Sequence, residues 1–198
     1  MKKLIVILIA GLMAAQFMGC AQKPSAASEA KIDLVARGKY LVTVGGCHDC
    51  HSPKVFGPRG AQIPDSTRLL SGHPQDMPIP AAWKPADLQQ RNIIASTNPI
   101  LTAWAGPWGV SFTANLTPDT TTGIGEWSEE TFIRTLRTGK HQGQPNGRDI
   151  LPPMPWFNYA QMTDADLKAV WAYLRSIPPV KNQVPFPVPP TTPVSMAN

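Results

Sequence analysis

The chain has 198 residues and a formal net charge of +5 at pH 7, with 22 prolines, 3 cysteines and 16% charged residues. Lys2 and Lys3 carry part of this excess, so the chain without residues 1–19 has a formal charge of only +3. Basic and aromatic residues do not alternate as they do in proteins that bind single-stranded nucleic acid, so we expect no nucleic-acid partner. The length is that of a single domain.

The N-terminus predicts export from the cytoplasm. Lys2 and Lys3 precede an apolar stretch over residues 4–18, which is shorter than the ~20 residues of a membrane span and suits a signal peptide. We therefore expect residues 1–19 to be a signal peptide. Gly19-Cys20 resembles the lipobox of bacterial lipoproteins, which implies lipidation of Cys20 and a place on the periplasmic side of a bacterial membrane. The alternative is ordinary cleavage nearby, without a lipid.

The rest of the chain divides into a tether, a domain and a tail. Residues 20–30 are small and polar, and we expect them to form a flexible, lipid-anchored tether. Residues 31–182 form the predicted domain, of which 52–114 is a long Pro-rich insertion, and residues 183–198 form a Pro-rich C-terminal tail. No period-two strand pattern is long enough to assign, so the predicted fold class is all-α.

A first helix is predicted from Ile32 to Val44, ending at Gly45-Gly46. In the second half of the chain, Ser128 is a candidate N-cap for a helix that stops at Gly139. Thr163 is a candidate N-cap for a third helix, which has an i, i+3, i+4, i+7 apolar face and ends before two prolines. The predicted domain thus has three main helices.

The sequence Cys47-His48-Asp49-Cys50-His51 directly follows the first predicted helix. A Cys-x-x-Cys-His sequence is the attachment pattern of a c-type haem, in which two thiols form thioethers and the histidine binds iron. We expect one covalent haem c on Cys47 and Cys50, with His51 as an iron ligand whose other ring nitrogen contacts a backbone carbonyl. His48 is expected to be a spacer. Half of a zinc site and a thioredoxin-like redox pair are the alternatives.

A methionine before the third helix is the candidate for the second iron ligand. Met154 lies between two prolines, which restrict the backbone and present the thioether from a stiff loop. Met77 also precedes a proline, but it lies in the insertion. His73 and His141 are expected to be solvent or loop residues, and a bis-histidine site would need one of them in place of Met154.

The order of these features resembles a class I cytochrome c. Three segments, residues 115–127, 136–139 and 154–156, are similar to the cytochrome c domains of bacterial membrane-bound alcohol and gluconate dehydrogenases, and the similarity covers about residues 32–182. Those subunits carry three Cys-x-x-Cys-His motifs, whereas this chain carries one. The resemblance implies helices around the haem, with Trp127 and Trp156 lining its crevice together with Tyr159. Core packing is the alternative for these aromatic residues.

Basic residues gather on the side of the chain that carries the candidate methionine: Arg134, Arg137, Lys140 and Arg148. They form a solvated helix face, or else one of them, Arg137, pairs with a buried haem propionate. A bidentate guanidinium suits that second role.

The expected function is electron transfer rather than catalysis. The chain would accept electrons from a dehydrogenase, of which it could be a subunit, and pass them to another cytochrome or a terminal oxidase. A peroxidase-like haem enzyme and a haem sensor are the alternatives, and each would require an open sixth position on the iron. A rigid Met154 loop argues against both.

Overall fold

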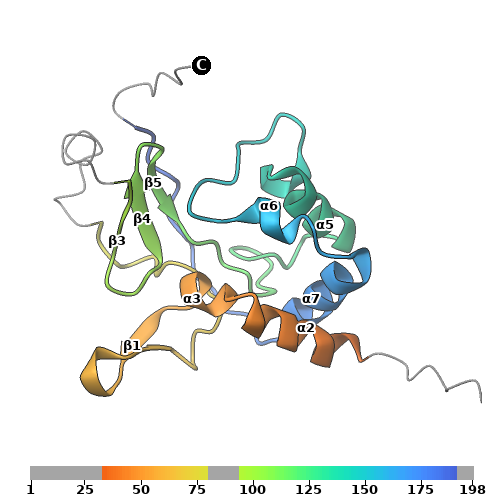
Figure 1. The fold of residues 1–198 in the computed structure, drawn as a ribbon, viewed down its shortest axis with the longest axis horizontal. Coiled ribbons are helices and arrows are strands. Elements are labelled where there is room, and N and C mark those ends of the chain that lie inside the picture. The colour runs from red at the N-terminus through yellow and green to blue at the C-terminus, as the bar shows by residue number, and fades with distance from the viewer. Residues whose placement is uncertain (1–32, 80–93, 191–198) are drawn as a thin grey trace, which may run out of the picture. The chain divides into compact units, whose positions relative to one another are not determined.

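The computed structural model describes residues 33–79 and 94–190 (Figure 1). The predicted signal peptide, Cys20 and the tether at 20–30 lie outside the described residues, as do 80–93 of the insertion and 191–198 of the tail. No helix in the part of the chain that the structure describes has the length and apolar character needed to cross a membrane.

Two of the predicted helices, α2 (Leu34–Val44) and α7 (Asp164–Ser176), pack against each other. The carboxylate of Asp33 accepts hydrogen bonds from the first turn of α2, and the Thr163 hydroxyl accepts one from the first turn of α7. Gly38 lies directly against the α7 backbone at Ala169, where a Cβ atom would clash. A glycine therefore sets how closely these helices approach.

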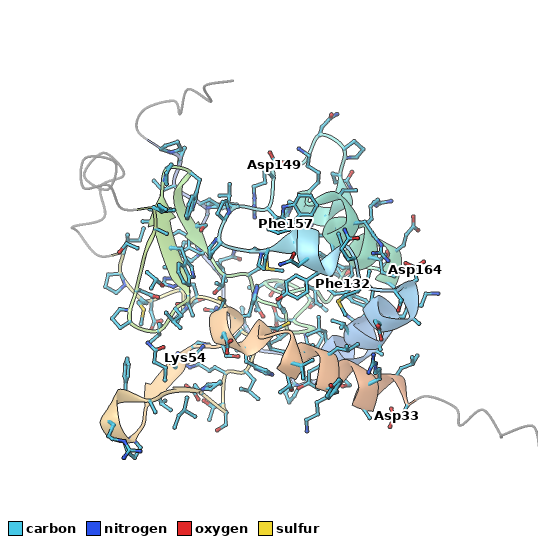
Figure 2. The ribbon with its side chains drawn as sticks, viewed as in Figure 1. Asp33, Lys54, Phe132, Asp149, Phe157 and Asp164 are labelled. Carbon is cyan, nitrogen blue, oxygen red and sulfur yellow. The ribbon has the colours of Figure 1, made fainter. Side chains whose placement is uncertain are left out.

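The third predicted helix is α5 (Glu129–Thr138). Ser128 accepts a hydrogen bond from the N–H of Thr131, and Gly139 ends the helix in the left-handed conformation at φ 65°. The ring of Phe132, labelled in Figure 2, lies 5.4 Å from that of Trp171 on α7. Together the three helices enclose the main hydrophobic core, whose buried members are Val42, Leu70, Ile124, Phe132, Val170, Tyr173 and Leu174.

The prediction of an all-α fold is wrong. Strands β1 (Lys54–Phe56) and β2 (Gln62–Pro64) form an antiparallel pair, and β3 (Ser96–Thr97), β4 (Ala103–Gly106) and β5 (Gly109–Phe112) form a three-stranded antiparallel sheet in the order β3-β4-β5. All five lie within the predicted insertion. They are two to four residues long, and the first three residues of β5 are all buried, so no alternating pattern marks them.

Shorter elements complete the described chain: α3 (Cys47–His51), the 3₁₀ turns η1 (Pro58–Gly60) and η2 (His141–Gly143), and α6 (Trp156–Tyr159). Figure 1 shows the three-stranded sheet on one side of α3 and helices α5 and α7 on the other. Residues 184–190 of the tail form no helix or strand, and Val188 exchanges two backbone hydrogen bonds with Val110 of β5, at 2.8 and 2.9 Å. The described part of the tail thus adds to the sheet.

Candidate haem-binding site

The Cys-x-x-Cys-His residues form one short helix, α3, which the chain enters through Gly46 in the left-handed conformation at φ 68°. Cys47 and Cys50 are free thiols, both partly buried. Burial raises the pKa of the Cys47 thiol to about 11 and also raises the pKa of the Cys50 thiol. Thioredoxin-like pairs depend on a lowered thiol pKa, so this environment does not favour that alternative.

His51 is buried, and its ring is held by a backbone carbonyl. Its Nδ1 atom lies 2.8 Å from the carbonyl oxygen of Ala114. Because a carbonyl can only accept a hydrogen bond, Nδ1 carries the proton and Nε2 keeps its lone pair. Burial lowers the pKa of the imidazole, which favours the neutral form. The expected contact with a carbonyl is present, and the ring has the tautomer that an iron ligand needs.

The donor set therefore fits a c-type haem: two free thiols lie on one helical turn, and a neutral imidazole with a free Nε2 follows them. Among the described residues, no group of three or more histidine, cysteine, aspartate or glutamate side chains is placed to bind a metal ion.

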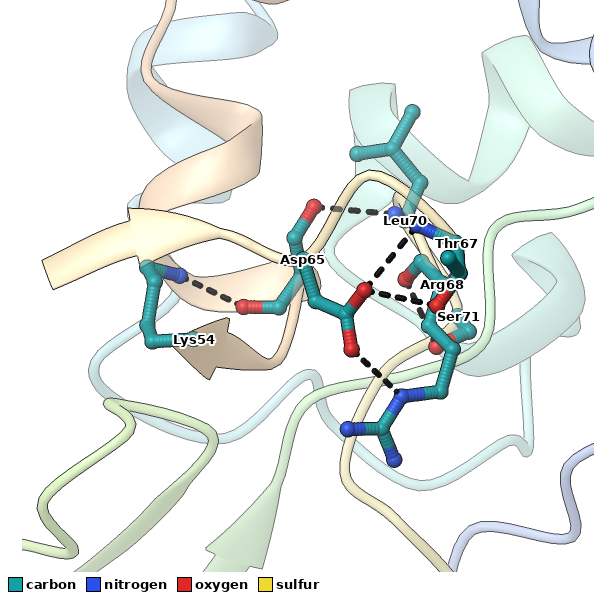
Figure 3. A network of polar contacts seen from close by, with 7 residues as sticks. Lys54, Asp65, Thr67, Arg68, Leu70 and Ser71 are labelled. Carbon is teal, nitrogen blue, oxygen red and sulfur yellow. Dashed lines mark hydrogen bonds and ion pairs between the residues drawn. The ribbon is translucent and has the colours of Figure 1, made fainter. Parts of the chain in front are cut away.

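The side chain of Lys54 caps the C-terminal end of α3. Its Nζ atom donates to the carbonyl oxygens of His48 at 2.8 Å and Ser52 at 2.5 Å, and the residue, which Figures 2 and 3 label, is buried. Burial lowers the pKa of this ammonium group. A cation beside carbonyls at the end of a helix is stabilised by the helix dipole. This contact was not predicted from the sequence, although a lysine just after a helix is a recognisable signal.

The candidate second ligand, Met154, is partly buried just before α6. Its carbonyl oxygen accepts a hydrogen bond from the N–H of Trp156 at 2.9 Å. At the end of α6, the phenol of Tyr159 donates to the carbonyl oxygen of Gly45 at 2.6 Å. Burial, and then the nearby Cys47, raise the pKa of Tyr159. The Tyr159 bond joins the end of α6 to the turn before the attachment motif, and ligation by Met154 stays a prediction.

The two predicted crevice tryptophans contact different parts of the fold. The indole of Trp156 packs on Gly139, where it leaves no room for a Cβ atom. Trp127 packs against the main core and meets the ring of His141 edge to face, with centroids 6.0 Å apart. Both tryptophans are partly buried, so the structure is compatible with a crevice and with core packing, and their role stays a prediction.

Arg137 already has protein partners. Its guanidinium donates to the carbonyl oxygen of Ala160 and to the carboxylate of Asp164, the latter at 2.5 Å. It also lines a surface pocket of about 490 Å³, which shares no residue with α3. The other lining residues are Glu129, Glu130, Ile133, Arg134, Asp164 and Lys168. Pairing with a haem propionate stays a prediction, and it would require this guanidinium to be shared.

His73 is a loop residue, as one of the two expectations had it, but it is not exposed to solvent. Only 1% of the residue is exposed, because segments distant in the sequence cover it. Its Nδ1 atom lies 2.9 Å from the Thr102 hydroxyl, and its Nε2 atom has no hydrogen-bond partner among the described residues. The backbone N–H of His73 donates to the carbonyl oxygen of Thr113, which is next to the Ala114 carbonyl that His51 contacts. His73 thus lies behind His51, on the Nδ1 side, so a bis-histidine site with His73 gains no support.

Several known proteins that are similar to this chain are named as cytochrome subunits of dehydrogenases. No protein-family model matches the chain. The gluconate 2-dehydrogenase cytochrome c subunit of Pantoea cypripedii is 29% identical over 161 residues, which is 78% of this chain and 27% of that protein. The alcohol dehydrogenase (quinone) cytochrome c subunit of Gluconobacter oxydans is 26% identical over 174 residues, which is 87% of this chain and 27% of that protein.

A third relative, the fructose dehydrogenase cytochrome subunit of Gluconobacter japonicus, is 35% identical over 91 residues, which is 43% of this chain and 18% of that protein. The matched region spans less than a third of each of these relatives. The resemblance stated from the sequence is confirmed: this chain is similar to the cytochrome c subunits of gluconate, fructose and quinone alcohol dehydrogenases.

Proposed function

We propose that the protein is a periplasmic electron carrier with one haem c, held covalently by Cys47 and Cys50 and ligated by His51 and Met154. The observation that supports this most strongly is the hydrogen bond from His51 Nδ1 to Ala114, because it leaves Nε2 free for iron. The bound haem would supply a one-electron ferric–ferrous couple.

Each part of the chain then has a physical task. The thiols on α3 fix the porphyrin edge, and the Ala114 carbonyl keeps the His51 ring in one orientation. Tyr159 ties the end of α6, the helix that follows Met154, to the turn before α3, and this bond restricts the relative position of the two candidate ligands. A constant ligand geometry suits electron transfer, which needs no acid, base or nucleophile from the protein.

The partner proposed is a dehydrogenase. The relatives are named as cytochrome subunits of gluconate, fructose and alcohol dehydrogenases. By analogy, the protein accepts electrons from a periplasmic dehydrogenase, as a subunit or as a separate carrier, and passes them to another cytochrome or a terminal oxidase. The matched region is only part of each relative, so the relatives do not identify the dehydrogenase. Co-purification from the source cells would identify it.

Covalent attachment is the first test. Haem should stay with the chain on denaturing electrophoresis, since thioethers survive unfolding. The double variant Cys47→Ser, Cys50→Ser should show no haem-stained band, whereas Cys20→Ala, which leaves α3 intact, should keep it. Haem retained by the double variant would contradict the proposal.

The coordination of the iron is the second test. The ferric protein should show the weak long-wavelength sulfur-to-iron band of a histidine–methionine site. High-spin features of a five-coordinate iron would contradict ligation by Met154 and favour a haem enzyme or a sensor instead.

The proposed anchor is lipid on Cys20, tethering residues 31–182 through 20–30. Acyl chains contribute ~0.8 kcal/mol per buried CH₂, so high salt should leave the protein in the membrane fraction and detergent should release it. Cys20→Ala behind an ordinary cleavable signal should give a soluble protein with the same spectrum. An unmodified N-terminus downstream of Cys20, found by mass spectrometry, would reject lipidation and leave the haem proposal intact.

A further inference from the structure

Residues Leu70–His73 form a strap that joins the main chain at His51 to residues 113–116. The N–H of Gly72 donates to the carbonyl oxygen of His51 at 2.8 Å, and the N–H of His73 donates to Thr113 at 3.0 Å. In the opposite direction, the N–H of Leu116 donates to the carbonyl oxygen of Leu70 at 2.8 Å. The strap therefore holds both ends of the contact between His51 and Ala114.

Gly72 brings the strap into direct contact with the acceptor carbonyl. A Cβ atom at this position would lie 2.5 Å from the carbonyl oxygen of Thr113 and 2.8 Å from that of Ala114. The residue also has φ +79°, a conformation that favours glycine. The approach is thus too close for any side chain.

A buried polar cluster, His73, Thr102 and Asn98, holds the same segment from the sheet side. His73 Nδ1 lies 2.9 Å from Thr102 Oγ1, and the Thr102 carbonyl oxygen accepts from the N–H of Thr113 at 2.9 Å. Asn98 accepts from the N–H of Thr102 at 2.8 Å and donates to its hydroxyl at 3.1 Å. All three members are at most 3% exposed. Buried hydrogen-bonded groups of this kind restrict a segment to one position.

The N-terminal end of the strap, at Leu70, is bonded to the residue that follows α3 (Figure 3). Ser52, the residue after His51, accepts a hydrogen bond from the N–H of Leu70 at 2.9 Å. Asp65 pairs with Arg68 at 2.9 Å in the turn that leads into the strap, and the Ser71 hydroxyl donates to the carbonyl oxygen of Arg68, also at 2.9 Å. The strap is therefore bonded to the end of the attachment helix as well as to the Thr113–Ala114 segment.

We propose that His73 and Thr102 are positioning residues for the iron ligand. They hold the Thr113–Ala114 segment so that the Ala114 carbonyl accepts the His51 Nδ1 proton, and they thereby set how strongly His51 donates to iron. A hydrogen bond to the second nitrogen of a ligating imidazole raises its basicity, and a more basic ligand favours ferric iron and lowers the reduction potential. This inference rests on the proposed function, because it requires His51 to be an iron ligand.

The test uses three variants of the full-length haem protein. Thr102→Val and His73→Leu remove the hydrogen bond at nearly constant volume, whereas His73→Asn keeps a polar atom near the position of Nδ1. Thr135→Val is the matched control: Thr135 is also buried, but its hydroxyl donates to Thr131 within α5. The readouts are the reduction potential, the solvent exchange rate of the His51 Nδ1 proton by NMR, and the melting temperature.

Thr102→Val and His73→Leu should raise the reduction potential and speed exchange of the His51 Nδ1 proton by about five- to tenfold, as expected for losing one buried hydrogen bond. His73→Asn should restore values near those of the wild type, and Thr135→Val should change only the melting temperature. If Thr102→Val lowers the melting temperature but leaves potential and exchange at the control values, the positioning role is wrong. A wild-type protein without covalent haem or histidine ligation would instead reject the proposed function.

Discussion

The phenol oxygen of Tyr159 lies 2.6 Å from the carbonyl oxygen of Gly45, although 114 residues separate them in the chain. Gly45 is in the turn before the Cys-x-x-Cys-His helix, and Tyr159 ends the short helix that follows Met154. One hydrogen bond therefore connects the two segments that carry the candidate iron ligands. We expect that connection to restrict the relative position of the two candidate ligands, so a change at Tyr159 tests the arrangement directly.

Tyr159→Phe removes the hydroxyl and leaves the ring. We expect the free energy of unfolding to fall by about 1 kcal/mol, because the Gly45 carbonyl loses its donor in a half-buried setting. Chemical denaturation measures the change. Tyr40→Phe on α2, where the side chain is exposed, should change stability by less than about 0.5 kcal/mol. Equal effects of the two variants would show that the bond to Gly45 does not stabilise the fold.

Gly38→Ala tests the close contact of α2 with α7. A Cβ atom at Gly38 would clash with the Ala169 carbonyl and approach the Tyr173 Cβ atom, so the helices must separate. We expect a loss of about 3 kcal/mol in the free energy of unfolding, the upper part of the usual range for overpacking. Gly60→Ala is the control, because the space there is open and only the positive φ is strained, at a cost of about 1 kcal/mol. A smaller loss at Gly38 than at Gly60 would contradict the steric argument.

The long helices were predictable because their signals are local. Ser128 and Thr163 accept hydrogen bonds from N–H groups three residues further along, and Gly139 adopts the left-handed conformation that ends α5. Each of these contacts depends on a few neighbouring residues, so the helix limits agree with the sequence pattern within about two residues. The strands were not predictable, because β3 to β5 have two to four residues each and depend on pairing with one another.

The candidate site likewise has a part that the sequence predicts and a part that it does not. The Cys47–His51 motif is a continuous sequence with a known chemical meaning, so the attachment residues could be named from it. The acceptor of the His51 proton is a backbone carbonyl 63 residues away, and any residue type can supply a carbonyl. Likewise, the burial of His73 depends on the sheet that covers it and leaves no mark in the surrounding sequence.

The Asp119 carboxylate gives a pH-dependent prediction. It accepts hydrogen bonds from the hydroxyl and N–H groups of Thr122, both at 2.7 Å, and from those of Thr121, and these bonds lower its pKa from 3.8 to about 2. A lowered pKa in the folded state stabilises the fold above pH 3.8, and this contribution is lost as the pH falls through about 2. Asp119→Asn should therefore flatten the fall in unfolding free energy between these pH values.

Denaturation followed by circular dichroism at a series of acidic pH values measures this slope. Thr121→Val, which removes one of the donors to Asp119, should give a slope between those of the wild type and Asp119→Asn. A wild-type slope in Asp119→Asn would mean that these hydrogen bonds stabilise the protonated and ionised carboxyl equally.

The last prediction concerns the second iron ligand. Met154→Ala should leave the haem attached through Cys47 and Cys50, because the thioethers do not depend on the iron. It should abolish the ferric sulfur-to-iron band, lower the reduction potential and let added imidazole bind the iron, since a methionine ligand raises the potential and occupies the sixth position. Met77→Ala is the matched control: the Met77 sulfur accepts a hydrogen bond from Asn98 at 3.4 Å within the insertion, so this variant should keep the band and bind no imidazole. Loss of the band in Met77→Ala, with retention in Met154→Ala, would transfer the ligand role to Met77.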